Sequence, residues 1–303
     1  MLQGFLFIIG NIVIASMQSV FLGQWLRSFN VYLVVGISFT IVMLLYVMIS
    51  LAKGVNYISV IGGMKKNILF LNVVSAGNWM FYFLAIKYLN PASVVTITQC
   101  MPAVLTSLFM LLARKPLSKV TLFFHGMMLL CICLLLKGIL YSPETQGSHA
   151  ILGAAIALMC AVTVALTIGL SKSFSNQGLP SYAVLSLRFP LLIAISWCMA
   201  PVTLLKAITP GQIGIIVTIA IIGLALTNFL LQKGIELSNP LIVSTTLSTS
   251  PFVVLIFDKI YRHDYVINEQ VYLITSIVIF SLLCVYADHR ATQRRKVISP
   301  LTQ

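Results

Sequence analysis

The chain has 303 residues and a formal net charge of +13, with 59% hydrophobic residues and only 8% charged ones. An average soluble protein carries about 25% charged residues, and the mean hydropathy of this chain is +1.03. This composition excludes a soluble enzyme, a nucleic-acid-binding domain and a linker-rich scaffold. It predicts an integral membrane protein that crosses the bilayer many times and has no nucleic acid among its partners.

Long apolar runs separated by short polar breaks predict ten membrane-spanning segments. A helix needs about 20 residues to cross the hydrocarbon core. Because a backbone in lipid must satisfy its own hydrogen bonds, and no alternating pattern is present, we expect an all-α membrane protein. The longest loop is expected at Ala52–Asn67. The expected spans are Gly4–Trp25, Val31–Leu51, Ile68–Tyr88, Pro91–Ala113, Thr121–Leu140, Ala150–Ser171, Tyr182–Leu204, Gln212–Gln232, Pro240–Phe257 and Val271–Tyr286.

A weak internal repeat relates the two halves of the chain. Pro102 and Pro251 each follow an Asn-Pro pair by eleven residues, with Ser and Thr residues between. The repeat predicts two five-helix units, residues 1–145 and 146–288, followed by a basic tail at 289–303. Because five is odd, the second unit enters the membrane in the opposite orientation. A 5+5 inverted-topology repeat is typical of transporters whose site lies near the bilayer midplane.

The distribution of basic residues predicts the orientation in the membrane. With the N-terminus in the cytosol, eleven Lys and Arg residues fall on the cytosolic side and six on the outer side. The positive-inside rule therefore favours cytosolic N- and C-termini and an even number of spans. We expect the inner (cytoplasmic) membrane of a bacterial cell, because the chain is short and carries no targeting tail.

Signatures of enzymes, disulfides and metal sites are missing from the sequence. The six cysteines lie inside apolar runs and none forms a CxxC pair, so neither a disulfide nor a metal site is expected. No GxSxG, HExxH or phosphate-binding loop is present. The sequence predicts no catalytic residue, no metal and no cofactor, and it favours a protein that is not an enzyme.

Three segments resemble helix signatures of EamA-type carriers, which belong to the drug/metabolite transporter (DMT) superfamily. They are FYFLAIKYLNPASVVTITQCMPAVLTSLFMLLARKPLS at 81–118, SLRFPLL at 186–192 and KGIELSNPLIVSTTLSTSPFVVLIF at 233–257. The resemblance implies a 5+5 helix bundle that works by alternating access. It also implies a small organic solute in a central cavity, often exported and often driven by protons or exchange, so a coupling proton is a candidate partner.

Arg188 is a charged residue about two helical turns inside the seventh span. Such an arginine should face protein or a wet cavity rather than lipid. Two roles stay open: a counter-charge for an anionic group of the substrate, or a structural or gating pair with Glu236 at the end of the eighth span. Glu236 also has Lys233 as an i,i+3 partner on its own helix, and the two pairings could coexist. The first half has Ser38 at the position of Arg188.

Pro102 and Pro251 lie in the middle of their helices. Proline removes one backbone hydrogen bond and kinks a helix, which frees the carbonyl groups of Thr98 and Leu247. Hydroxyl groups or water can bond such carbonyls, and broken helices in transporters often line the site. We therefore expect both prolines to shape a cavity wall, with a simple packing kink as the alternative.

Amides, hydroxyls and aromatic rings recur at mid-span positions in both halves. Polar groups are costly in hydrocarbon without partners, so they either join helices together or line a wet cavity. Their recurrence in corresponding helices favours a cavity that binds substrate. Together with Arg188, the candidate substrate-binding residues are Asn11, Gln18, Asn78, Trp79, Tyr82, Thr96, Gln99, Thr163, Asn228, Thr245 and Ser248.

The sequence therefore predicts a secondary transporter, most simply an exporter, of a small organic metabolite such as an amino acid or a related carboxylate. The alternative substrates are a nucleotide-sugar, a drug-like molecule or another phosphorylated or cationic solute. Alternatives of other classes are a polytopic membrane enzyme acting on lipid-linked substrates and a non-transporting receptor. The expected partners are the solute and the lipid bilayer, and the choice between monomer and dimer stays open.

Overall fold

The structure is a computed structural model that describes residues 2–25, 29–141, 148–201, 203, 208–262 and 269–298. These residues form helices, and no strand occurs among them. Within the described ranges, ten helical segments are long and apolar enough to cross a membrane, judged by length and composition. The predicted all-α membrane class is confirmed.

The first five spans begin and end close to the expected residues, except that the third starts earlier and has a kink at Met64. They are α1 (Leu2–Trp25), α2 (Val31–Ala52), α3 (Tyr57–Tyr88), α4 (Pro91–Leu112) and α5 (Lys119–Tyr141).

Three of the last five spans are interrupted. The sixth span is α6 (Ser148–Asn176), and the seventh is α7 (Ser181–Arg188) followed by α8 (Pro190–Met199). The eighth consists of α10 (Pro210–Thr218), the π-helix η2 (Ile219–Leu226) and α11 (Thr227–Leu237). The ninth is α12 (Pro240–Leu247) and α13 (Ser250–Arg262), and the tenth is α14 (Glu269–Ile298). Because α14 continues to Ile298, part of the expected tail at 289–303 is helical.

The prediction of a long loop at Ala52–Asn67 is wrong, because α3 already begins at Tyr57. The side chain of Asn56 caps this helix by accepting a hydrogen bond from the backbone nitrogen of Ser59, a role that asparagine fills well. Tyr57, Val60, Met64 and Ile68 recur at helical spacing and pack against the buried cluster around Phe174. Met64 has non-helical angles (φ −130°, ψ 24°) and marks a kink within α3. The apolar face was not predicted because polar residues and glycines lie between its members in the sequence.

Prolines explain two of the interruptions. The ninth span breaks before Pro251, as predicted, and the hydroxyl of Ser250 donates to the freed carbonyl of Leu247 at 2.7 Å. The first half differs, because α4 runs as one helix through Pro102. The seventh span breaks before Pro190, which was not predicted. It also ends at Met199 because the following residue precedes Pro201 and has an extended backbone; the end expected at Leu204 lies outside the described residues.

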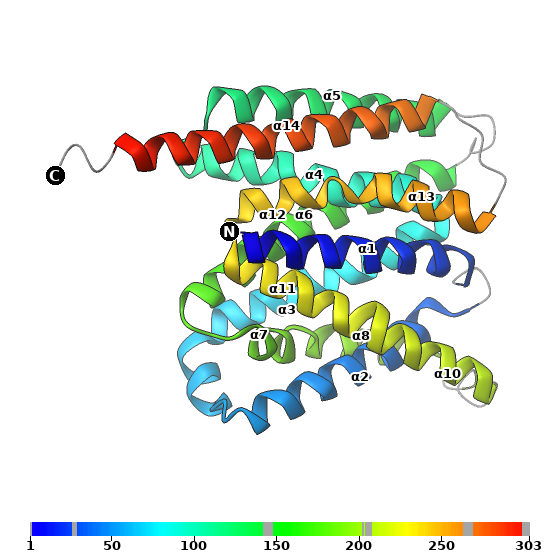
Figure 1. Cartoon of the computed structure of the whole chain (residues 1–303). Helices are drawn as coiled ribbons and strands as arrows, with labels where there is room; N and C mark the ends of the chain where they lie inside the picture. The colour runs from blue at the N-terminus through cyan, green and yellow to red at the C-terminus, as the bar shows by residue number, and fades with distance from the viewer. Residues whose placement is uncertain are drawn as a thin grey trace.

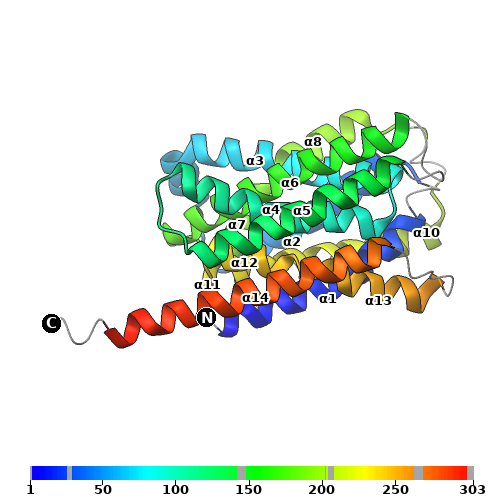
Figure 2. The ribbon, with the colours of Figure 1, turned by 90° about the horizontal axis from the view of Figure 1, so that it is seen from above.

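The helices lie alongside one another, and α1 begins at the same end of the bundle as α14 ends (Figure 1 and Figure 2). We refer to this end as the N-terminal end of the bundle. α5 and α14 pack together at one edge, and α2 packs against α7 and α8 at the opposite edge. α1, α3, α4, α6, α11, α12 and α13 occupy the space between these pairs.

The contacts between spans come in matched pairs. α3, the third span, packs against α6, the sixth span, and α1, the first span, packs against α11 of the eighth span. In the predicted repeat the third and eighth spans are equivalent in the two halves, and so are the first and sixth, so the two contacts correspond. Equivalent residues also meet: the rings of Phe39 and Phe189 lie 4.9 Å apart, and the Ser248 hydroxyl donates to the Gln99 carbonyl at 3.2 Å. An inverted 5+5 repeat would produce this pattern. The repeat and the domain limits derived from it stay predictions.

Replacing Gly153 of α6 with valine should destabilise the bundle. A Cβ atom at this position would lie 2.8 Å from Leu89 Cγ and 2.9 Å from Tyr88 Cβ, and overpacking of this kind costs about 1–3 kcal/mol. We expect a lower melting temperature for the purified protein in detergent. Gly169→Val on the same helix is the control, since a Cβ there meets nothing within 4 Å. Equal melting temperatures for both variants would contradict the close packing of α3 and α6.

Candidate functional site

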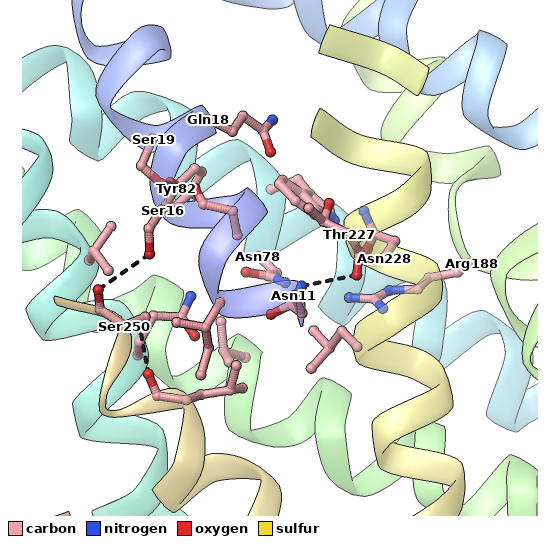
Figure 3. A pocket seen from close by; sticks show the side chains of 18 residues that line it. Asn11, Ser16, Gln18, Ser19, Asn78, Tyr82, Arg188, Thr227, Asn228 and Ser250 are labelled. Atoms are coloured by element: carbon pink, nitrogen blue, oxygen red, sulfur yellow. Dashed lines mark hydrogen bonds between the residues drawn. The ribbon is translucent and has the colours of Figure 1, made fainter. Parts of the chain in front are cut away.

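A cavity of about 90 Å³ lies between the central helices (Figure 3). Its lining comes from α1, α3, α4 and α6 and from α7, α11, α12 and α13, so both halves of the chain contribute. Eight of the twelve predicted substrate-binding residues line it. They are Asn11, Gln18, Asn78, Trp79, Tyr82, Gln99, Arg188 and Asn228.

One face of α1 supplies much of the polar lining. The Asn11 side chain donates to the carbonyl of Thr227 at 2.9 Å, and the Ser16 hydroxyl donates to the carbonyl of Ser250 at 3.3 Å. The Ser19 and Tyr82 hydroxyls lie 2.6 Å apart. These bonds join α1 to the third, eighth and ninth spans while leaving the polar groups at the cavity wall.

Arg188 is almost fully buried, with 2% of its surface exposed. Its Nε donates to the Ser75 hydroxyl at 3.0 Å, whereas its Nη1 has no hydrogen-bond partner among the described residues. In Figure 3 the guanidinium points toward Asn11 and Asn228. α7 ends at Arg188, and the carbonyls at a helix C-terminus favour a positive charge.

Two more donors at the cavity lack a partner. Gln18 Nε2 and Trp79 Nε1 are buried and make no hydrogen bond within the described part of the chain. Gly223 of η2 leaves space for the Gln18 side chain, since a Cβ atom at Gly223 would lie 2.9 Å from Gln18 Cδ. No Asp or Glu lines the cavity among the described residues. The cavity therefore presents unused donors and one positive charge, which suit an acceptor-rich anion.

The side chain of Asn72 bonds the backbone groups that the break in the seventh span leaves unpaired, and the sequence analysis did not predict this role. In a continuous helix the Leu191 amide would donate to the Leu187 carbonyl. Instead, Asn72 Nδ2 donates to the Leu187 carbonyl at 2.7 Å, and Asn72 Oδ1 accepts from the Leu191 amide at 3.2 Å. This side chain from α3 thereby holds the end of α7 that carries Arg188.

Four predicted residues do not line the cavity. The Thr96 and Thr163 hydroxyls donate to carbonyls of their own helices, at 2.6 Å and 2.7 Å, which is a common state of threonine in helices. Ser248 bonds the carbonyl of Gln99. Thr245 lies behind the wall, 3.3 Å from Nε2 of the buried His125, whose Nδ1 is 2.5 Å from the Ser107 hydroxyl. Ser248 and Thr245 thus join helices, which was the alternative role considered for such groups, whereas Thr96 and Thr163 bond within their own helices.

Four polar residues line the cavity without having been predicted: Ser16, Ser19, Thr227 and Ser250. Three of them have a signal in the sequence that reasoning could have used: Ser19 follows Gln18, Thr227 precedes Asn228, and Ser250 precedes Pro251. Ser16 has no such signal, because it lies far around the helix from Asn11 and Gln18.

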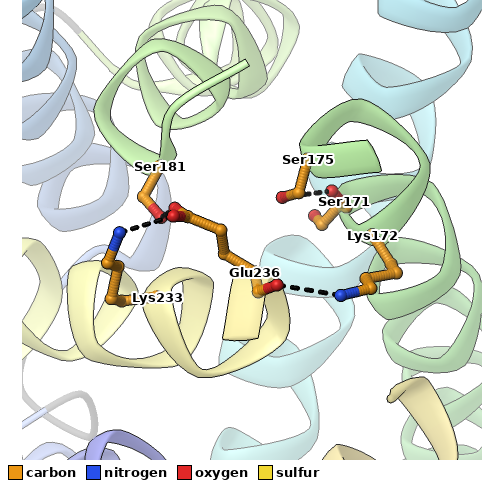
Figure 4. A network of polar contacts seen from close by, with 6 residues as sticks. All are labelled: Ser171, Lys172, Ser175, Ser181, Lys233 and Glu236. Carbon is orange, nitrogen blue, oxygen red and sulfur yellow. Dashed lines mark hydrogen bonds and ion pairs between the residues drawn. The ribbon is translucent and has the colours of Figure 1, made fainter. Parts of the chain in front are cut away.

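The pair between Arg188 and Glu236 is not formed. Glu236 Oε1 instead bonds Lys233 Nζ at 2.5 Å, and the Ser181 hydroxyl donates to Glu236 Oε2. Lys172 Nζ donates to the backbone carbonyl of Glu236 at 2.8 Å (Figure 4). The network joins α6, α7 and α11 near the N-terminal end of the bundle, apart from the cavity lining. Of the two pairings left open, the structure contains the one with Lys233.

Within the described residues, ten helices long and apolar enough to cross a membrane, seven of which line a polar cavity, define a multi-pass membrane protein. Residues 2–137 match the model of the EamA-like transporter family, which belongs to the DMT superfamily. The matched stretch covers the first five helices, and over it the resemblance drawn from the motifs is confirmed.

The solved structures extend the likeness in fold to the second half. One match, described only as the crystal structure of a protein, has a TM-score of 0.64 and covers 93% of this chain and 96% of its own, at 13% sequence identity. Such low identity establishes a common fold alone. A search of curated proteins finds no significant match.

Replacing Asn72 with leucine should weaken the seventh span. The change leaves the Leu187 carbonyl and the Leu191 amide without their partner, and each unpaired buried group costs about 1–3 kcal/mol. We expect a clearly lower melting temperature in detergent. Asn67→Leu on the exposed face of the same helix is the control and should change it little. An Asn72→Leu protein as stable as the control variant would refute the bridging role.

Glu236 should be energetically coupled to Lys233 and not to Arg188. The side chains of Lys233 and Glu236 are 32% and 24% exposed, and partly exposed pairs contribute about 0.2–1 kcal/mol. A double-mutant cycle with Glu236→Gln and Lys233→Gln, measured by unfolding in mixed micelles, should give a coupling of about 0.5 kcal/mol. The cycle with Arg188→Gln should give none. A larger coupling to Arg188 would revive the gating pair.

Proposed function

We propose that this protein is a secondary transporter that exports a small organic solute carrying a carboxylate, such as an amino acid or a related metabolite. The solute binds in the central cavity, and the two halves rearrange around it by alternating access. We place the protein in the cytoplasmic membrane with both termini in the cytosol, as the distribution of basic residues favours. Transport, and not catalysis, is the proposed activity.

One observation carries the proposal: three buried donors, at Gln18, Trp79 and Arg188, line one cavity, and among the described residues they have no partner and the cavity wall has no acid. A buried donor left unpaired is destabilising, and an uncompensated buried charge is more so. A carboxylate would bring two acceptor oxygens and the opposite charge, and Arg–carboxylate pairs form two parallel hydrogen bonds. The bound solute would thus remove the free-energy cost of the unpaired donors and of the buried charge.

The size and charge of the cavity favour this substrate class over the alternatives. Sites for drug-sized ligands measure about 300–1,000 Å³, whereas this cavity has a volume of about 90 Å³. A nucleotide-sugar would not fit without extensive rearrangement. A cationic solute would face Arg188 with no lining carboxylate to balance it among the described residues.

The fold supports alternating access. Matched contacts such as α3 with α6 and α1 with α11 provide two similar interfaces that could open in turn. The interrupted seventh and ninth spans contribute Arg188 and Ser250 to the cavity, as discontinuous helices do in many transporters.

Counterflow in liposomes tests the proposal, because it needs no ion gradient. Liposomes containing the purified protein are loaded with one unlabelled L-amino acid at a time, and uptake of the labelled form is measured. We expect uptake for at least one amino acid and none for the amine that has the same side chain without the carboxylate. Arg188→Gln should lower the uptake at least tenfold, because it removes the charge that balances the carboxylate.

Two further variants separate binding from folding. Ser75→Ala removes only the bond to Arg188 Nε and should reduce uptake less than Arg188→Gln does. Lys53→Gln removes one exposed charge away from the cavity and should leave uptake unchanged. Equal transport of amines and amino acids, or full activity of a well-folded Arg188→Gln protein, would overturn the carboxylate assignment. A lack of counterflow with every solute would overturn transport itself and favour a membrane enzyme or receptor.

A further inference from the structure

A second hollow lies outside the cavity, in a groove between the C-terminal ends of α4 and α6. It measures about 670 Å³ and is bounded by the turn that joins α11 to α12, at Ser238 and Asn239. We call it the α4–α6 groove. Its residues are distinct from those of the central cavity, so its chemistry needs its own explanation.

Two lysines, Lys115 and Lys172, give the groove a positive charge. Lys172 is held in place, because one of its Nζ donors bonds the backbone carbonyl of Glu236 at 2.8 Å (Figure 4). A lysine ammonium has three donors, so two remain for a ligand. The Glu236 carboxylate is engaged by Lys233 and Ser181, and no acid lines the groove among the described residues.

Thr106 supplies an independent sign of a ligand. It lies at the groove, is 7% exposed, and its hydroxyl has no hydrogen-bond partner in the described part of the chain. Thr96 and Thr98 on the same helix bond the carbonyls four residues earlier, whereas Thr106 does not. A buried hydroxyl without a partner is destabilising, and a bound acceptor oxygen would satisfy it.

The rest of the groove is apolar. Phe109 and Met110 of α4 and Ala165 and Gly169 of α6 line it. A Cβ at Gly169 would meet nothing within 4 Å, so the space beside it is open. The groove therefore combines a cationic, hydroxyl-bearing part with a hydrocarbon wall, which matches an amphiphile better than a small ion.

We propose that the α4–α6 groove binds an anionic phosphate group, carried by the headgroup of an anionic phospholipid. Basic pockets between membrane helices bind such headgroups. The phosphate oxygens accept from Lys115, Lys172 and Thr106, and the acyl chain lies along the apolar wall. This proposal does not depend on transport through the central cavity, so each can fail without the other.

Lipid titrations of the delipidated protein, followed by native mass spectrometry, test the site. The probes are phosphatidylglycerol, zwitterionic phosphatidylcholine and inorganic phosphate. We expect phosphatidylglycerol to bind tightest, and Lys115→Gln/Lys172→Gln to weaken it by roughly 30-fold, from about fivefold per lysine. Lys65→Gln/Lys66→Gln removes the same charge from exposed positions of α3 at the same end of the bundle and should change the affinity less than twofold.

Thr106→Val guards against a folding artefact, because it keeps the shape of the side chain and removes only the unpaired hydroxyl. It should weaken phosphatidylglycerol binding severalfold without lowering the melting temperature. Displacement of phosphatidylglycerol by millimolar inorganic phosphate would identify free phosphate as a second source of the same ligand chemistry. Equal affinity for phosphatidylcholine, or binding unchanged in both groove variants, would overturn the proposal.

Discussion

The buried guanidinium of Arg188 is the constraint on which the arrangement of the central helices depends. A charge that is only 2% exposed has to be balanced by hydrogen bonds, helix dipoles or a ligand. Ser75 accepts from one donor, and Arg188 is the last residue of α7, where the helix dipole favours a positive charge. The donor at Nη1 has no hydrogen-bond partner among the described residues, and Arg188 lies at the cavity wall. The bundle can bury this arginine because a polar cavity stays open next to it.

Bonds at both ends of α7 fix the position of that arginine. At the start of the helix, Ser181 donates to Glu236 on α11. At its end, Asn72 of α3 bonds both sides of the break before Pro190. The same two helices, α3 and α11, contribute Trp79 and Asn228 to the cavity wall. Any movement of α3 relative to α11 therefore changes the surroundings of Arg188. The shape of the cavity and the position of its positive charge are linked in this way.

The sequence predicts what depends on local pattern and fails where a partner lies far away in the chain. Spans follow from hydropathy, and the spacing of Asn11 and Gln18 places both on one helical face, which the structure confirms. Thr96 and Thr163 were placed at the cavity because a sequence does not reveal when a hydroxyl bonds its own helix. The role of Asn72 depends on a break 115 residues away, so no local pattern could indicate it.

The scarcity of acids gives the two hollows their common character. The chain has six Asp and Glu residues against nineteen Lys and Arg, and no acid lines either hollow within the described residues. Glu236, whose backbone bonds a lysine of the groove, has its carboxylate occupied by Lys233 and Ser181. Neither Arg188 nor Lys172 is therefore neutralised by it. Buried or partly buried positive charge without a counter-ion attracts anions and repels cations, so the placement of these few acids already favours anionic ligands at both sites.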